Sequence, residues 1–261
     1  MAYQFVQCTK LKNHSKFMGR PKDLKNVFLK VVNNCKYLVI LVFFSCLAEP
    51  PKTSEYGELY DFDGNKYLTI KIGNQIWMAE NLKTTSFSNG DPIQELRSNS
   101  EWGRPLNVPE VIKPGWSYYE NDPLNNEFHG KFYNWYAIAD QRNCCPDGWR
   151  IPTKLDFDTM MSFLGDKKEA LRKIKKDGDV WPKSDKANNK SGFSAYPSGY
   201  RNNGGDFYDL GRITDFWVSD SYINSNNQSV KQGLIISSGV DDYGYNGYSK
   251  EWGHSVRCIK H

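Results

Sequence analysis

Four aromatic residues lie close together in a Gly- and Asn-rich segment near the C-terminus: Tyr243, Tyr245, Tyr248 and Trp252. Such rings carry a large apolar face, and they stack on sugar rings or anchor a protein partner. The segment is too polar for a buried strand, so we predict an exposed loop whose four rings bind a carbohydrate or a surface protein. The alternative is that Trp252 and one or more of the tyrosines pack against a sheet.

Two acidic segments invite comparison with calcium sites, because hard cations bind closely spaced carboxylates and carbonyls. Residues 61–65 lack the third acid and the final Glu of a calcium loop, so an Asp-Gly hairpin turn is favoured, and Asp241-Asp242 stands without a supporting motif. The histidines are not spaced as zinc ligands either. We therefore predict no metal site and no cofactor, and we expect His254 to be a structural residue with satisfied hydrogen bonds.

Signatures of hydrolases and nucleotide-binding enzymes are missing from the sequence, which has no Gly-x-Ser-x-Gly elbow and no phosphate-binding glycine loop. A basic patch does occur, with nine Lys and Arg residues against four acidic residues between positions 167 and 190. Nucleic-acid binding would use such charge, but beyond residue 45 the chain has 26 basic and 29 acidic residues. We predict no nucleic-acid partner. A solvated helix face, or contact with anionic glycans or lipid headgroups, fits the patch better.

The N-terminal segment has the layout of a secretory signal. Its first 36 residues contain eight basic residues and one acidic residue, and a short apolar run follows at 37–45. A start at Met18 would give this signal an ordinary length. The formal net charge of +4 is therefore a property of the leader, because the rest of the chain is mildly acidic.

The end of the apolar run, Phe43-Phe-Ser-Cys46, resembles the lipobox of bacterial lipoproteins, in which a small residue precedes a lipidated cysteine. The two phenylalanines are bulkier than usual, whereas Ser45 and the following Pro50-Pro51 fit the pattern. The resemblance implies a leader at 1–45, lipid on Cys46 and a tether at 46–55, which would anchor an exported protein at the outer membrane or cell surface. Ordinary cleavage beside Cys46 and an uncleaved anchor remain as alternatives.

Hydrophobic periodicity indicates both strands and helices over residues 56–261. A strand is predicted at 66–72, and Gly73-Asn74 joins it to a second strand at 75–78. A helix capped by Thr153 should end at Gly165, and a basic helix should cover 167–176. Residues 81–114 are predicted to be loop. Further short strands are predicted at 193–196, 207–210, 216–219, 234–237 and 255–259.

Six phrases occur in an order that is typical of one family. They cover residues 63–65, 72–82, 130–136, 145–153, 191–201 and 255–259. Together they resemble the Fibrobacter succinogenes major paralogous domain over about residues 56–260. The resemblance implies an α+β, C-type lectin-like fold, related to sulfatase-modifying folds, with a small twisted antiparallel sheet, two helices and long loops. It implies a fold and an exported location rather than an activity.

The resemblance also implies a disulfide between Cys145 and Cys258, which suits an exported, loop-rich domain. Cys144 would then be a free thiol, a link to a second chain or the alternative partner of Cys258. We expect a non-catalytic surface binding or adhesion module, with glycans as the first ligand class to test. The alternatives are an enzyme with a loop-built site, since the sulfatase-modifying folds include catalysts, and a structural envelope protein.

Overall fold

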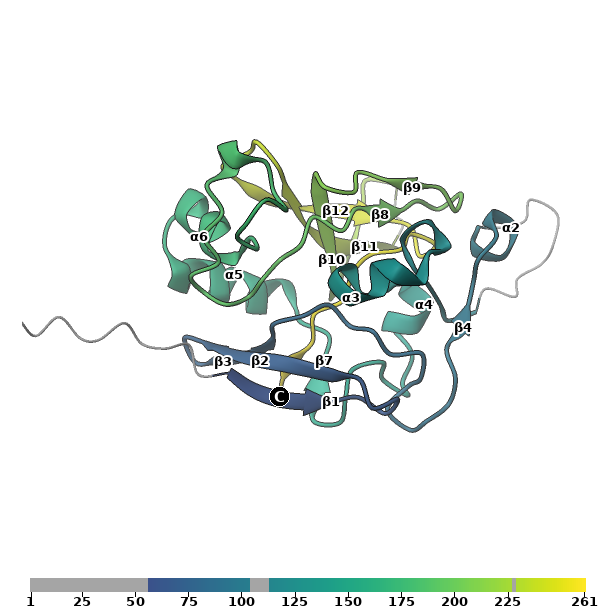
Figure 1. Cartoon of the computed structure of the whole chain (residues 1–261). Coiled ribbons are helices and arrows are strands. Elements are labelled where there is room, and N and C mark those ends of the chain that lie inside the picture. The colour runs from purple at the N-terminus through teal and green to yellow at the C-terminus, as the bar shows by residue number, and fades with distance from the viewer. Residues whose placement is uncertain (1–55, 104–112, 227–228) are drawn as a thin grey trace, which may run out of the picture. The chain divides into compact units, whose positions relative to one another are not determined.

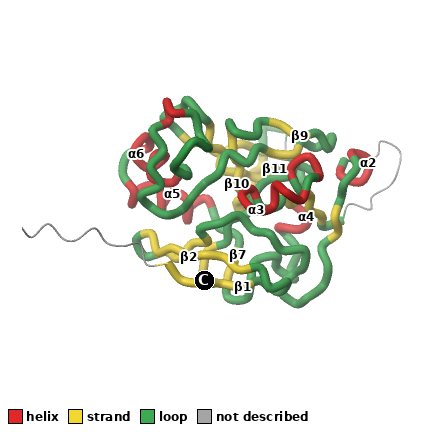
Figure 2. Tube along the Cα trace, viewed as in Figure 1, coloured by secondary structure: helices red, strands yellow, loops and turns green. Residues whose placement is uncertain are grey.

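Residues 56–103, 113–226 and 229–261 are described by a computed structural model, and their helices and mainly antiparallel sheets make an α+β domain (Figures 1 and 2). All of them lie within the unit Thr53–His261. The predicted leader, Cys46 and the tether lie outside the described residues. Within the described part of the chain, no helix has the length and apolar character needed to cross a membrane.

The largest sheet contains both the first and the last described strands, and we call it the terminal sheet. Its order is β1-β2-β3-β13-β7, and neighbouring strands are antiparallel. The strands are β1 (Tyr56–Tyr60), β2 (Lys66–Ile72), β3 (Gln75–Met78), β7 (Trp149–Arg150) and β13 (Ile259–Lys260).

The turns of this sheet confirm the sequence prediction. Between β1 and β2 the Asp61 carboxylate accepts hydrogen bonds from the backbone and side-chain nitrogens of Asn65, at 2.9 and 2.8 Å. Gly64 has φ +81°, and Gly73 between β2 and β3 has φ +60°. Glycine adopts this left-handed backbone without steric cost, which explains its place in both turns.

A second sheet, which we call the meander sheet, consists of β10 (Ile213–Ile223), β11 (Ser229–Ser237) and β12 (Tyr243–Tyr248) in sequence order. Two helices pack beside it, α5 (Lys154–Leu164) and α6 (Lys167–Ile174), as Figure 1 shows. Thr153 and Asp156 form the predicted capping box of α5, and Asp166 caps α6. Both predicted helices are confirmed, with α6 ending two residues early.

The remaining elements are short. One small sheet contains β4 (Gln94–Glu95), β5 (Gly115–Ser117) and β6 (Phe132–Tyr133), and another contains β8 (Tyr200–Arg201) and β9 (Phe207–Tyr208). The short α-helices are α2 (Asn99–Trp102), α3 (Asn126–His129) and α4 (Trp135–Ile138). The 3-10 turns are η1 (Tyr119–Asn121), η2 (Pro123–Asn125) and η3 (Lys183–Asp185).

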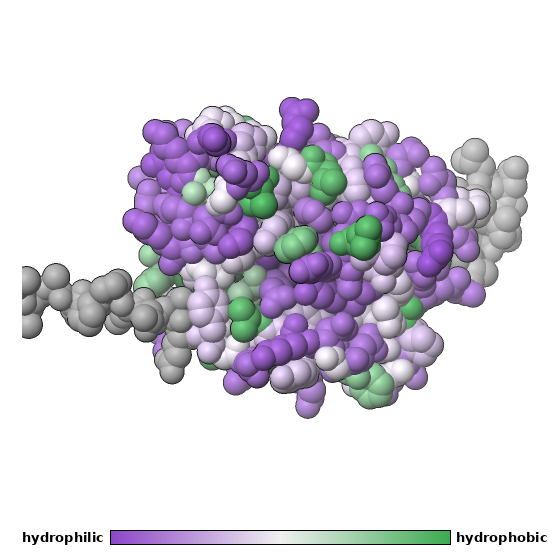
Figure 3. Space-filling view, viewed as in Figure 1, coloured by the Kyte–Doolittle hydropathy of each residue, from purple (hydrophilic) through white to green (hydrophobic). Residues whose placement is uncertain are grey.

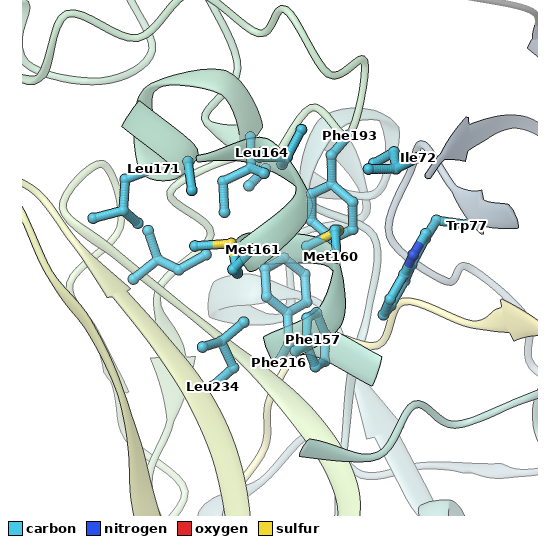
Figure 4. Close-up of a cluster of buried hydrophobic side chains, with 14 of the residues drawn as sticks. Ile72, Trp77, Phe157, Met160, Met161, Leu164, Leu171, Phe193, Phe216 and Leu234 are labelled. Carbon is cyan, nitrogen blue, oxygen red and sulfur yellow. The ribbon is translucent and has the colours of Figure 1, made fainter. Parts of the chain in front are cut away.

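The largest hydrophobic cluster fills the space between α5, α6 and the two main sheets. Figure 4 shows Phe157, Met160 and Met161 of α5 between Phe216 and Leu234 of the meander sheet on one side and Trp77 of the terminal sheet on the other. A second cluster includes Trp135, Trp149 and Trp217, all of which are buried.

The predicted disulfide is present: Cys145 and Cys258 are bonded, with Cα atoms 5.9 Å apart. Cys144 is a buried free thiol. Burial raises its pKa to about 12, so this thiol stays protonated at neutral pH. The disulfide therefore joins the segment before β7 to the residue just before the last strand, β13.

Four sequence predictions about backbone structure were wrong. Residues 193–196 form irregular structure rather than a strand, and of the strand predicted at 255–259 only Ile259 lies in one, β13. Residues 81–114, predicted to be loop, contain α2 and β4. The aromatic segment 243–252 was predicted to be a loop, but residues 243–248 form β12. Its glycines and asparagine are tolerated because β12 pairs with β11 along its whole length.

Candidate functional site

The structure does not gather the four predicted aromatic residues into one exposed group. Successive side chains of a strand point to opposite faces, so Tyr243 and Tyr245 of β12 lie on one face and Tyr248 on the other. Tyr243 and Tyr245 pack against the hydrophobic cluster beneath α5. Tyr248 belongs to the second cluster, and Trp252 is partly buried against that cluster.

Tyr245 is held by α5. Its hydroxyl donates to Asp158 Oδ1 at 2.9 Å, and Lys154 Nζ lies 4.6 Å from its ring centroid. Burial, followed by the hydrogen bond to Asp158, raises the pKa of Tyr245. These contacts connect β12 to α5, which is a structural use of the ring.

Tyr248 and Trp252 surround His254, which is fully buried. The ring centroid of His254 lies 4.2 Å from that of Tyr248, 4.5 Å from Trp217 and 5.8 Å from Trp252. Neither ring nitrogen has a hydrogen-bond partner among the described residues, and burial lowers the pKa of His254 to about 3. His254 is buried as expected, but the expectation that its hydrogen bonds are satisfied was wrong, because aromatic rings surround it.

The strongest candidate site is a hollow of about 310 Å³ that is mainly apolar, and we call it the apolar hollow. Its lining comes from α3, the segment before η3, the loop before β8 and the turn after β9. The lining residues are Phe128, His129, Val180, Tyr196, Pro197, Leu210 and Gly211.

Aromatic rings dominate one part of the apolar hollow. The ring centroids of Phe128 and Tyr196 are 5.9 Å apart, and those of His129 and Tyr196 are also 5.9 Å apart, with planes at 82°. Phe128 is 52% exposed and Leu210 is 39% exposed, so these apolar side chains face solvent. In Figure 3, separate hydrophobic patches interrupt the hydrophilic surface on the face that displays α3 in Figure 1.

Local sequence explains how α3 presents Phe128 and His129 to the apolar hollow. Pro123 starts η2, whose first turn is capped by Asp122, and α3 follows directly. Gly130 ends α3 with φ +66°, and a Cβ there would lie 2.7 Å from the carbonyl oxygen of Leu82. Only glycine lets the end of α3 approach so closely.

A buried polar chain holds the ring of His129. Its Nδ1 lies 3.2 Å from Ser198 Oγ, and Asn81 Nδ2 donates to the same Oγ at 3.3 Å and to the His129 carbonyl at 2.9 Å. Behind them Arg257 Nε donates to Asn81 Oδ1 at 2.7 Å. Burial lowers the pKa of His129, so the imidazole is neutral at pH 7.

This arrangement fits binding better than nucleophilic catalysis. Ser198 is fully buried, and its Oγ already contacts Asn81, His129 and the carbonyl of Tyr196, so it is not presented to a substrate. The neutral ring of His129 keeps Nε2 as its remaining hydrogen-bonding atom. The apolar hollow therefore combines apolar rings with one oriented polar side chain, as small-molecule sites do.

The two acidic segments have structural partners. Asp61 holds its own turn, while Asp241 and Asp242 pair with Lys168 and Lys167 at 2.5 and 2.7 Å. Among the residues that the structure describes, no group of three or more His, Cys, Asp or Glu side chains is arranged to hold a metal ion.

Sequence reasoning missed Phe128, Tyr196 and Leu210. One signal was available for Phe128, which stands with Leu124 in an otherwise polar segment, 120–129. Tyr196 lies within a phrase that carries the family resemblance, but nothing local indicates that it meets α3. The three residues come together only through the long connections of the fold.

A family model described as the Fibrobacter succinogenes major domain matches residues 70–260, and this range includes every residue that lines the apolar hollow. No curated protein and no solved structure matches the chain.

Proposed function

The chain belongs to the Fibrobacter succinogenes major domain family, and from this premise and the apolar hollow we propose that it is a surface binding module whose hollow takes a saccharide. The observation that carries the proposal is the exposed ring of Phe128 and the half-buried ring of Tyr196 beside the oriented His129. The protein acts by holding its ligand, and the proposal assigns no catalytic residue.

The size and chemistry of the hollow favour one sugar unit over a larger ligand. Small-molecule sites measure roughly 300–1,000 Å³, and this hollow, at about 310 Å³, lies at the lower end. A pyranose ring has an apolar C–H face that stacks on an aromatic ring, while its hydroxyls need hydrogen-bonding partners at the edge. Tyr196 and Phe128 offer the aromatic rings, and His129 Nε2 offers a hydrogen-bonding partner for a hydroxyl.

A glycan array followed by titration calorimetry tests the proposal. We expect one sugar class to bind, and we expect Phe128→Ala and Tyr196→Ala to weaken its binding at least about tenfold, the effect typical of a ring at the centre of a site. Absence of binding to every sugar on the array, together with turnover of any substrate, would favour the enzyme alternative instead.

Phe163→Ala is the matched control. Phe163 is 66% exposed and stands on α5, so the change removes the same side chain from a comparably exposed helical position outside the apolar hollow. We expect this variant to bind as the unmodified protein does. Equal losses in the Phe128 and Phe163 variants would mean that the aromatic residues act through general surface hydrophobicity, which contradicts the proposed site.

The proposal includes a C-type lectin-like fold and a lipid anchor. Pairing of β13 with β3, the disulfide, the two helices α5 and α6, and the long connections between short strands all support the fold assignment. The anchor is supported by the basic and apolar order of the leader and by Ser45-Cys46. In this proposal the lipid holds the binding module at the bacterial outer membrane or cell surface.

Metabolic labelling with palmitate tests the anchor. We expect the unmodified protein to be labelled and to partition into membranes, and we expect Cys46→Ser to lose the label. Cys144→Ser is the control, since that buried thiol should not affect labelling. Label that survives Cys46→Ser would place the lipid elsewhere.

A further inference from the structure

A second hollow, of about 190 Å³, lies where α6, η3 and the β11–β12 turn meet, and we call it the basic hollow. It lies in the basic patch of the sequence. Its lining residues are Lys168, Leu171, Arg172, Lys175, Ser184, Asp185, Lys186, Gly239, Val240 and Asp241. Lys168 and Arg172 lie one turn apart on α6, and Lys175 is the residue that caps its C-terminal end, so the three cations all reach this hollow.

The two carboxylates of the basic hollow are already paired. Asp185 accepts from Lys175 Nζ at 2.8 Å and from the Gly239 amide at 2.6 Å, and both charged side chains are almost fully buried. Asp241 pairs with Lys168 at 2.5 Å. These ion pairs therefore neutralise Lys168 and Lys175, two of the four cations that line the basic hollow.

Arg172 and Lys186 are paired less tightly than Lys168 and Lys175. The nearest carboxylate oxygen to Arg172 belongs to Glu169 at 3.7 Å, which is too long for a hydrogen bond, and Arg172 Nε is buried without a partner. Lys186 is exposed and forms no ion pair with any described residue. The Arg172 side chain is 25% exposed, so the accessible part of its guanidinium can donate to an anion that enters the hollow.

We propose that the basic hollow binds a phosphate or sulfate group, held by the guanidinium of Arg172 and the ammonium of Lys186. The volume is several times the roughly 30 Å³ of one water molecule, so a tetrahedral oxyanion fits. Arginine donates to such oxygens in pairs, and lysine adds a point charge. This site is separate from the apolar hollow and does not depend on the function proposed for it.

Titration calorimetry with sodium sulfate and sodium phosphate, at ionic strength held constant with sodium chloride, tests the site. We expect saturable binding that Arg172→Gln and Lys186→Gln each weaken about tenfold, since each removes a charge-assisted contact. Arg172→Lys should restore part of the loss. Lys183→Gln is the matched control, because Lys183 is an exposed lysine of the same 3-10 turn that does not line the hollow.

Sedimentation with phosphatidylcholine vesicles, with and without phosphatidic acid, distinguishes the source of the group. Binding that requires phosphatidic acid and is lost in Arg172→Gln indicates a lipid phosphate, whereas binding to the free anions alone indicates a soluble ester or ion, and both support the site. No binding of either anion overturns the proposal. So does an equal loss in Lys183→Gln, which would indicate diffuse attraction to the basic patch.

Discussion

Two buried arginines show how single residues hold a domain with long irregular connections. Arg257 donates to the carbonyls of Met78, Phe193 and Ser194, and Arg201 donates to those of Leu96, Arg97 and Gly205. Each guanidinium has five donors in a fixed plane, so it can satisfy several loop carbonyls at once. Burial lowers their pKa values to about 9 and 10, and both remain charged at neutral pH.

Asp215 should make stability depend on pH. It is buried, and burial raises its pKa from 3.8 to about 7, although Tyr248 donates to it at 2.7 Å. The folded state therefore binds a proton more tightly than the unfolded state. Raising the pH from about 4 to about 7 should cost up to about 1.4 kcal/mol per pH unit, and Asp215→Asn should remove this loss.

Urea denaturation of both proteins across this range measures the effect. Neighbouring His254, whose pKa is lowered to about 3, contributes in the opposite direction, because its stabilisation is lost as pH falls from its ordinary value of 6.5. His254 is present in both proteins, so the difference between them reports on Asp215. Parallel stability profiles for the two proteins would contradict the assigned pKa.

At the scale of elements, what the sequence predicted well was local. The capping box, the apolar face and Gly165 of α5 lie within one segment, and the helix has the predicted bounds. The Asp-Gly turn and the β2–β3 hairpin are equally local. The long-range disulfide was confirmed too, but it rested on the family resemblance rather than on spacing.

The candidate site could not be predicted in the same way, because it depends on pairing between distant segments. β12 is a strand because Tyr245 pairs with Leu234 and Tyr243 with Ile236, and composition alone favoured a loop. That pairing separates the predicted aromatic residues onto two faces. The apolar hollow is formed by residues more than eighty positions apart, such as Phe128 and Leu210, and no local pattern contains that information.

The capping box of α5 should contribute measurably to stability. Thr153 Oγ1 accepts from the Asp156 amide at 3.1 Å, and Asp156 also pairs with Arg150 at 2.6 Å. Thr153→Ala should lower the free energy of unfolding by about 1 kcal/mol, whereas Thr153→Ser retains the acceptor and should lower it less. Urea denaturation compares the two. Equal losses would mean that the methyl group, and not the cap, is responsible.

At the scale of the whole molecule, the last residues connect the separate sheets. His254 exchanges backbone hydrogen bonds with Tyr133 of the sheet β4-β5-β6. Ser255 forms backbone hydrogen bonds with Asp215 and Trp217 of the meander sheet. Further on, the Cys258 carbonyl accepts from Met78 of the terminal sheet at 3.1 Å. The C-terminal segment is therefore a shared neighbour of three sheets, and the disulfide fixes it to the segment before β7.

Removing this cross-link should destabilise the entire domain rather than one edge. The disulfide spans 113 residues, and in the chain-entropy model a loop of about that length contributes roughly 4 to 5 kcal/mol by restricting the unfolded chain. Cys145→Ala combined with Cys258→Ala should lower the free energy of unfolding by that order, a large part of the roughly 5–15 kcal/mol available to a typical domain. Urea denaturation of the oxidised proteins measures the loss.

Two comparisons identify the source of that loss. Cys144→Ala removes a buried thiol from the same segment without opening the cross-link, so its smaller loss measures packing alone. Far- and near-ultraviolet circular dichroism should show one shared transition in the double variant, because the C-terminal segment bonds to all three sheets. If the terminal sheet melts first and the meander sheet persists, the disulfide holds one edge only, and the backbone hydrogen bonds of residues 254–258 are what unite the domain.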